Sequence, residues 1–174
     1  IVSTDYEEIS NVARKYGGDV PFMRPEELAQ DEATSMEAVQ HALEWLKEKS
    51  ACNEGIKWFE NNFGKKADYQ KLLDLLAIEN KVNWARWLLD NVGRTNTIKE
   101  IDGDLVCKSS LFFAGSIKVK GNLAVSFSVI AGDGISAGGD ISAGWGISAG
   151  EGISAGGGIS AGDGIAGGWG MEGG

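Results

Sequence analysis

The chain has 174 residues, 43% of them apolar, and a formal net charge of −9, which is an ordinary composition for one or two globular domains. The negative charge argues against direct binding to nucleic acid or to an anionic membrane by charge attraction. No run of eighteen apolar residues is present, so no membrane span is predicted. Cys52 and Cys107 lack metal-like spacing and are expected to be buried, reduced thiols of a protein in the cytoplasm of a bacterial host cell.

Residues 1–94 are predicted to form an antiparallel helical bundle. Thr4-x-x-Glu7 has the pattern of a capping box at the start of a helix. A later helix is expected to open at Asp68, and a last one is expected to be capped by Asn83. Short connections between these segments favour antiparallel neighbours. Aromatic residues at helical spacing are interpreted as bundle core: Trp45, Trp58, Phe59, Trp84 and Trp87.

An acidic stretch runs from Asp19 to Glu44, with Arg24 as its one basic residue. Such a surface could occupy the cationic nucleic-acid groove of another protein, as acidic inhibitors do. A solvated helix face is the alternative interpretation. The candidate protein-binding residues of this stretch are Glu26, Glu27, Asp31 and Glu32.

The next segment carries two short signatures. Ala51-Cys52-x-x-Gly55-x-x-Trp58 is followed by Trp84-Ala85-x-Trp87-Leu88-Leu89. Together they are similar to a small helical module of phage and bacterial proteins with ill-defined functions, some of them described as immunity proteins. The resemblance implies a context of mobile elements and protein inhibition, and it carries over no catalytic residue.

Residues 95–104 are interpreted as a hinge, after which a large apolar residue returns at every sixth position of residues 105–174. Within each late repeat, Ile and the Ala two places on share one face of a short strand, because side chains alternate with a period of two. The Gly-x-Gly that follows can turn a corner. The twelve positions are Leu105, Leu111, Ile117, Leu123, Val129, Ile135, Ile141, Ile147, Ile153, Ile159, Ile165 and Met171.

This period resembles that of the hexapeptide-repeat β-helices, in which three sides close one triangular coil. The resemblance implies a Gly-rich β-solenoid of about four coils, and an α+β fold class for the whole chain. The acidic or Trp position stands where that family has a small residue. A flatter, two-sided coil therefore remains an alternative.

If one coil has eighteen residues, positions eighteen apart stack at about 4.8 Å, the spacing of neighbouring strands. That register places Asp133 over Glu151 with Trp169 next, and Phe127 over Trp145 with Asp163 next. An exposed Trp beside carboxylates suits a protein interface. The alternative is that each Trp merely covers the glycine backbone beneath it. The candidate binding residues here are Asp133, Trp145, Glu151, Asp163 and Trp169.

The search for catalytic chemistry finds no constellation. His41 is the one histidine, and it lies in a predicted helix rather than in the coils, where hexapeptide-repeat acyltransferases need one. The outward serines have no neighbouring base. The carboxylate spacing lacks the calcium-binding nonapeptide pattern. We therefore predict no enzymatic activity, no cofactor and no metal.

The repeat continues in full register to Met171, so the last coil is expected to present open strand edges. A homodimer that pairs these edges, or a protein partner that covers them, is predicted. The dimerisation candidates are Ile159, Ile165 and Met171.

The leading hypothesis is a non-enzymatic, acidic binding protein of phage or mobile-element type. It would inhibit a host nucleic-acid-handling machine, with an anti-CRISPR role as one candidate. The alternative is a structural or assembly protein whose solenoid associates with itself. An ice-binding surface is a third possibility, weakened by the absence of Thr rows.

Overall fold

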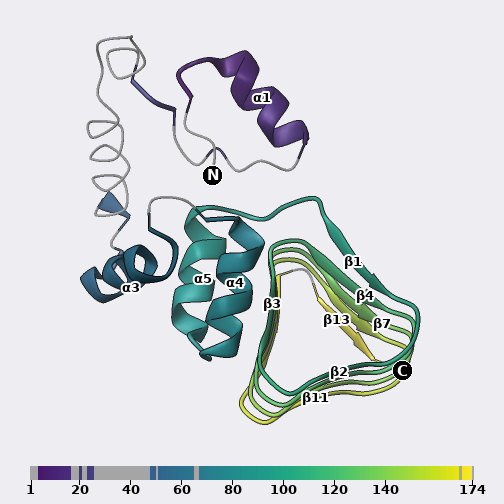
Figure 1. Ribbon diagram of the computed structural model, residues 1–174. Helices are drawn as coiled ribbons and strands as arrows, with labels where there is room; N and C mark the ends of the chain where they lie inside the picture. Colours follow the sequence, from purple (N-terminus) through teal and green to yellow (C-terminus); the bar gives the residue numbers. More distant parts are fainter. Residues whose placement is uncertain are drawn as a thin grey trace. The chain divides into compact units, whose positions relative to one another are not determined.

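The computed structural model of the chain describes residues 4–16, 20, 23–25, 48–49, 51–64, 67–168 and 170–173. The chain divides into two compact units, Ile1–Tyr69 and Gln70–Gly174. The predicted α+β class is confirmed, since helices precede a parallel β-solenoid of about four coils with three sheets (Figure 1). Among the described residues, no helix is long and apolar enough to cross a membrane.

In the first unit, α1 (Glu7–Lys15) begins after Tyr6, so the prediction that Thr4 caps this helix is wrong. Thr4 instead forms a parallel β-bridge with Met23. Its hydroxyl oxygen accepts a hydrogen bond from the Tyr6 N–H at 3.1 Å, which places it two residues too early to cap the helix.

The second described helix of this unit, α3 (Asn53–Phe63), starts at a cysteine. The Cys52 sulfur accepts a hydrogen bond from the Gly55 N–H at 3.3 Å and so caps the helix. Cys52 and Cys107 are both free thiols, as predicted. The prediction that both are buried is wrong, because Cys52 lies at the exposed start of α3 and Cys107 is only partly buried.

The helices α4 (Tyr69–Ile78) and α5 (Val82–Asn91) form a hairpin. Its turn contains Asn80, which has a positive φ of 54°. The N-cap of α5 is Lys81, so the predicted cap at Asn83 is wrong by two positions. The apolar side of the hairpin is formed by Leu72, Leu73, Leu76, Ala77 and Ala85, all buried.

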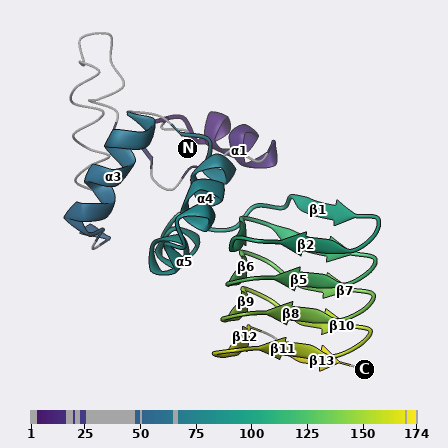
Figure 2. The same ribbon diagram turned by 60° about the horizontal axis from the view of Figure 1, so that its bottom comes forward.

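The solenoid consists of thirteen short parallel strands in three sheets. Sheet 1 has the order β1-β4-β7-β10-β13, sheet 2 the order β2-β5-β8-β11, and sheet 3 the order β3-β6-β9-β12. The coils stack in layers (Figure 2), and in cross-section they are triangular (Figure 1). The strands are β1 (Ile98–Ile101), β2 (Leu105–Cys107), β3 (Leu111–Phe113), β4 (Ser116–Val119), β5 (Leu123–Val125), β6 (Val129–Ala131), β7 (Ile135–Ala137), β8 (Ile141–Ala143), β9 (Ile147–Ala149), β10 (Ile153–Ala155), β11 (Ile159–Ala161), β12 (Ile165–Gly167) and β13 (Met171–Gly173).

The register confirms the predicted period of eighteen residues. Ile117 pairs with Ile135, and Ile135 with Ile153. The aliphatic residues of the middle coils form the core and are at most 1% exposed. The segment predicted as a hinge, residues 95–104, contains β1, which pairs with β4 and adds a strand before the first predicted repeat.

The corner between β9 and β10 contains two glycines, Gly150 and Gly152, and steric contact with a neighbouring coil explains only the first. A Cβ at Gly150 would lie 2.2 Å from the carbonyl oxygen of Gly132 in the coil above. A Cβ at Gly152 would meet only the Gly170 carbonyl oxygen at 3.6 Å, which is ordinary van der Waals contact. The first glycine is therefore required by the close approach of two coils, whereas the second is optional.

A ladder of side chains holds the corner between sheets 1 and 2. The Asn122 N–H donates to Asp104 Oδ1 at 2.7 Å, and the Asp140 N–H donates to Asn122 Oδ1 at 2.8 Å. The Gly158 N–H then donates to Asp140 Oδ1 at 2.7 Å. Each side chain thus accepts the backbone N–H of the next coil, and the neutral Asn122 separates two like charges.

The hairpin of α4 and α5 covers the first strands of sheet 3. Two outward-facing residues of this sheet, Phe112 and Ile130, are 1% and 3% exposed. Gln70 of α4 donates to the Phe112 carbonyl oxygen and accepts from the Ala114 N–H. Its side-chain amide thus supplies hydrogen-bond partners to two backbone groups at the edge strand β3. In a solenoid, such a cover protects the first coil from unwanted strand addition.

Candidate functional site

An aromatic pair stands at the corner between sheets 2 and 3. Phe127 and Trp145 occupy the same position of successive coils, as predicted, because the Trp145 N–H donates to the Phe127 carbonyl oxygen at 3.0 Å. Their ring centroids lie 4.9 Å apart in an edge-on arrangement. Trp145 nevertheless remains 42% exposed. The backbone hydrogen bond between the coils and the contact with the Phe127 ring hold the Trp145 side chain in place, although it still faces solvent.

The outward face of sheet 2, next to this pair, carries no charged side chain in its stacked row. The outward row of sheet 2 consists of Val106, Ala124, Ser142 and Ser160, in register from coil to coil. Small uncharged side chains at strand spacing make a flat surface that costs less to desolvate than a charged one. We call this row, together with Phe127 and Trp145, the aromatic corner.

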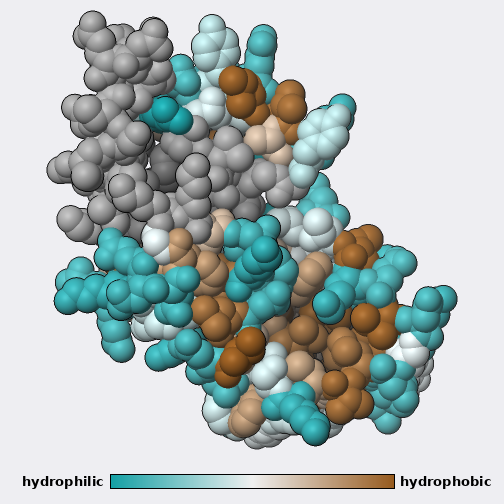
Figure 3. Space-filling view, in the orientation of Figure 1, coloured by the Kyte–Doolittle hydropathy of each residue, from teal (hydrophilic) through white to brown (hydrophobic). Residues whose placement is uncertain are grey.

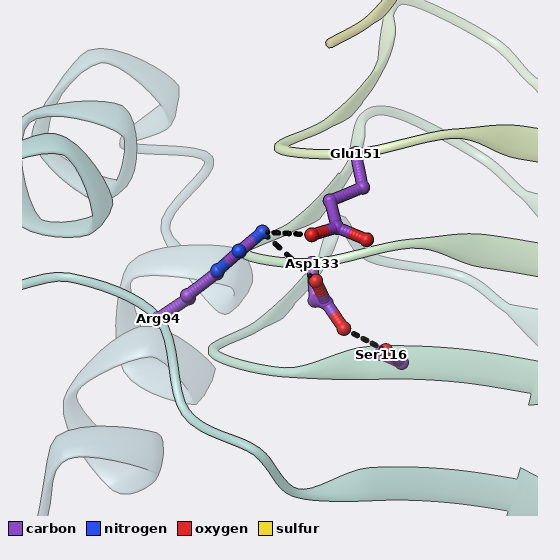
Figure 4. Close-up of polar contacts among 4 residues, drawn as sticks. All are labelled: Arg94, Ser116, Asp133 and Glu151. Carbon is purple, nitrogen blue, oxygen red and sulfur yellow. Dashed lines mark hydrogen bonds and ion pairs between the residues drawn. The ribbon is translucent and has the colours of Figure 1, made fainter. Parts of the chain in front are cut away.

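An acidic pair stands at the corner between sheets 3 and 1. Asp133 lies directly over Glu151, as predicted, and Arg94 Nη1 bridges the two carboxylates at 3.0 and 2.7 Å (Figure 4). Ser116 donates its hydroxyl hydrogen to the other oxygen of Asp133. Arg94 follows the last turn of α5, so these ion pairs connect the hairpin to two coils at once.

A shallow groove of about 380 Å³ runs beside the acidic pair on the outer face of sheet 1. Its polar lining includes Lys118, Ser136, Ser154 and Glu172, which pair in one row across successive strands. The core isoleucines form its floor only through their backbone, since their side chains point inward and are buried. The groove is open, and it offers no enclosed space for a small apolar ligand.

The remaining predicted residues are distributed as follows. Asp163 is exposed and lies one coil beyond Trp145, whose carbonyl oxygen accepts the Asp163 N–H at 3.1 Å. Ile159 and Ile165 are partly buried, and Met171 is 54% exposed, so the last coil is the least covered part of the core. Dimerisation through it stays a prediction. Glu26, Glu27, Asp31, Glu32, His41, Trp45 and Trp169 lie outside the described residues.

The sequence did not predict the roles of two residues that connect the helices to the solenoid, Arg94 and Gln70. Arg94 lies 39 positions before Asp133, outside any repeat, and no local pattern marks its role. Gln70 is 42 positions before its partner Phe112. Within the described part of the chain, no group of three or more His, Cys, Asp or Glu residues could hold a metal ion.

A family profile described as the YdhT N-terminal domain matches residues 39–96, which is 58 of the 174 residues. The match includes α3, α4 and α5 and ends just before β1. Both signatures of the predicted helical module fall within it. Residues 39–96 are thus similar to this domain, and a β-solenoid follows them in the chain.

Three enzymes share a shorter similarity. A stretch of 50 residues is 46% identical to the pseudaminic acid cytidylyltransferase of Campylobacter jejuni subsp. jejuni serotype O:23/36, covering 29% of this chain and 22% of that enzyme. The enzyme of the same name from serotype O:2 is 44% identical over 50 residues, with the same coverage. The N-acylneuraminate cytidylyltransferase of Escherichia coli O18:K1:H7 is 51% identical over 43 residues, covering 25% of this chain and 10% of that enzyme. The chain thus matches about a fifth of the first two relatives' length, and less of the third. No solved structure matches.

Proposed function

We propose that this chain is a non-enzymatic binding protein whose solenoid presents the aromatic corner to a basic protein partner. The observation that carries this proposal is Trp145, an exposed aromatic ring fixed against Phe127 at 4.9 Å. Aromatic anchors of this kind supply most of the energy of many interfaces. A rigid anchor also loses little conformational entropy on binding.

The charge of the solenoid supports a basic partner. From Gly121 to Gly174 the chain has five acidic residues and no Lys or Arg. Arg94 neutralises part of the acidic pair, whereas Asp163 beside the aromatic corner has no ion pair within the described residues. Carboxylates around an aromatic anchor increase the association rate with a cationic surface.

Nucleic-acid-handling proteins have such cationic surfaces, because they neutralise phosphates with Lys and Arg. We therefore propose a bacterial nucleic-acid-binding machine, such as a CRISPR-type defence complex, as the partner class. The resemblance of the helical module to phage and bacterial proteins supports this choice. The helices would serve chiefly to cap and support the solenoid.

The test uses a purified CRISPR effector complex as the partner and a basic protein of unrelated function, such as lysozyme, as the control for charge alone. Binding is measured by biolayer interferometry for the unmodified chain and for Trp145→Ala. We expect Trp145→Ala to weaken binding about tenfold or more, as loss of a central aromatic anchor does. Ile78→Ala is the control variant, because Ile78 is an exposed apolar residue on α4, outside the aromatic corner, and it should change affinity little.

Equal binding to lysozyme and to the effector would show an unspecific charge effect and would contradict the proposal. Equal loss of affinity in Trp145→Ala and Ile78→Ala would contradict the role of the aromatic corner. A chain that binds no effector complex, yet forms large assemblies by itself, would favour the structural alternative.

The similarity to cytidylyltransferases favours a second candidate, activation of a nonulosonic acid. The test is release of pyrophosphate from CTP in the presence of N-acetylneuraminic or pseudaminic acid. We expect none, because the matching stretch covers at most 22% of those enzymes. Turnover that survives further purification would replace the first proposal.

A further inference from the structure

The helix α1 exposes its apolar residues to solvent. Ile9 and Val12 are 53% and 55% exposed, and the flanking Tyr6 and Tyr16 are 62% and 81% exposed. Single exposed apolar residues are common, but these four follow each other at steps of three and four and form one stripe along the helix. Figure 3 shows brown hydrophobic side chains gathered over α1. We call these four residues the α1 stripe.

The one fully buried residue of α1 is polar. Ser10 is fully buried, and its hydroxyl oxygen makes no hydrogen bond. A surface helix normally buries its apolar side and exposes its polar side. In α1 the fully buried residue is a serine, whereas two aliphatic side chains are exposed, which makes the α1 stripe a candidate binding surface.

Two charged residues of α1, Glu8 and Lys15, favour a second α1 helix as the partner. Glu8 and Lys15 are seven positions apart, so they lie on the same flank of the α1 stripe, about 10 Å from each other along the axis. Among the described residues, neither of them forms an ion pair. In an antiparallel pair of identical helices, Glu8 of one copy lies opposite Lys15 of the other, and this contact occurs twice.

We propose that the α1 stripe binds the α1 stripe of a second copy of this chain in an antiparallel, two-fold contact. The sequence of α1 is self-complementary for that arrangement: acidic residues occupy its first turn and basic residues its last turn. A parallel arrangement would place like charges side by side. A helix of nine residues is only about 14 Å long, so the contact is smaller than a standard interface, and the association is reversible and depends on concentration.

The experiment is sedimentation velocity of the full chain across a wide concentration range. We expect a monomer–dimer equilibrium for the unmodified chain, and at least a tenfold higher dimer dissociation constant for Ile9→Lys. Ile9 is already exposed, so this variant should retain the circular dichroism spectrum of the unmodified chain. Ile78→Lys is the matched control, because Ile78 is an exposed isoleucine on α4, outside the α1 stripe, and it should leave the equilibrium unchanged.

Charge exchange tests the orientation. Glu8→Lys and Lys15→Glu should each weaken the dimer, because each places like charges opposite each other. An equimolar mixture of the two variants should restore it as a heterodimer, in which one helix is basic on that flank and the other is acidic. A monomer at every concentration, an unaltered dimer in Ile9→Lys, or a mixture that fails to recover would each overturn the proposal. Loss of the dimer in Ile165→Lys instead would place the contact at the last coil and would also overturn it.

Discussion

Alanine at the two glycines of one corner should have opposite effects on stability. At Gly150, the new Cβ would lie 2.2 Å from the Gly132 carbonyl oxygen. This neighbour is backbone in the coil above, so the coils must separate locally and their hydrogen bonds must lengthen. At Gly152 the new Cβ meets only the Gly170 carbonyl oxygen at 3.6 Å, so nothing has to move.

Forced overpacking of this kind costs about 1–3 kcal/mol, and we expect Gly150→Ala to lie at the upper end because backbone cannot rotate away. Gly152→Ala should instead stabilise by roughly 0.4–1 kcal/mol, since alanine reduces the conformational freedom of the unfolded chain. The two variants should therefore differ by about 2–4 kcal/mol in the free energy of unfolding. For a unit of this size, that corresponds to roughly 10–20 °C in Tm.

The assay is thermal unfolding of both variants and the unmodified chain, followed by circular dichroism at a strand wavelength. The two substitutions add the same methyl group two residues apart, so composition and unfolded-state hydration cancel in the comparison. Equal Tm values for Gly150→Ala and Gly152→Ala would refute the reasoning that close approach of the coils dictates the first glycine.

Three further substitutions test contacts that join the elements. Ser110→Ala should lower the free energy of unfolding, measured by chemical denaturation, by about 1–3 kcal/mol. Ser110 is 2% exposed, and its hydroxyl donates to Asn80 Oδ1 and accepts from the Ser128 N–H. An unchanged denaturation midpoint would contradict this role. Arg94→Met should cost only about 0.2–1 kcal/mol per ion pair, and the difference should vanish in concentrated salt, since the guanidinium is half-exposed. Asn122→Ala should cost about 0.5–1.5 kcal/mol, because the Asp140 N–H loses its acceptor at an exposed position. Ser136→Ala, which removes no bond of this ladder, is the control.

The repeat pattern was sufficient to predict the solenoid. A strict period of six fixes which side chains face inward, and a coil of eighteen residues then stacks Asp133 over Glu151 and Phe127 over Trp145. These contacts follow from sequence spacing alone, because each coil contacts only its neighbours. β1 was not predicted, because Lys99 occupies the inward position that an aliphatic residue holds in later repeats. The ammonium group of Lys99 lies 5.8 Å from the centroid of the Phe113 ring.

The contacts between the hairpin and the solenoid were not predictable in the same way. They join non-repeating residues to repeating ones across forty or so positions, and no period relates the two. One signal did exist: the outward positions of sheet 3 hold Phe112 and Ile130 in the first coils, where the later coils hold Ser148 and Ala166. Large apolar residues at outward positions indicate a cover.

That cover leads to a prediction about fragments. Residues 99–174 lack the hairpin, so Phe112 and Ile130 would be exposed to solvent and the edge of β3 would lose Gln70. Burial of two such side chains contributes roughly 1.5–3 kcal/mol each, a large part of the marginal stability of a small domain. We expect residues 99–174 to be unfolded or aggregated, and residues 67–174, which retain α4 and α5, to unfold cooperatively.

The measurement is the melting curve of each fragment by circular dichroism. If both fragments melt at the same temperature, the helices are an appendage rather than the cap of the solenoid. If neither fragment folds, residues before Asp68 must contribute to the cap as well.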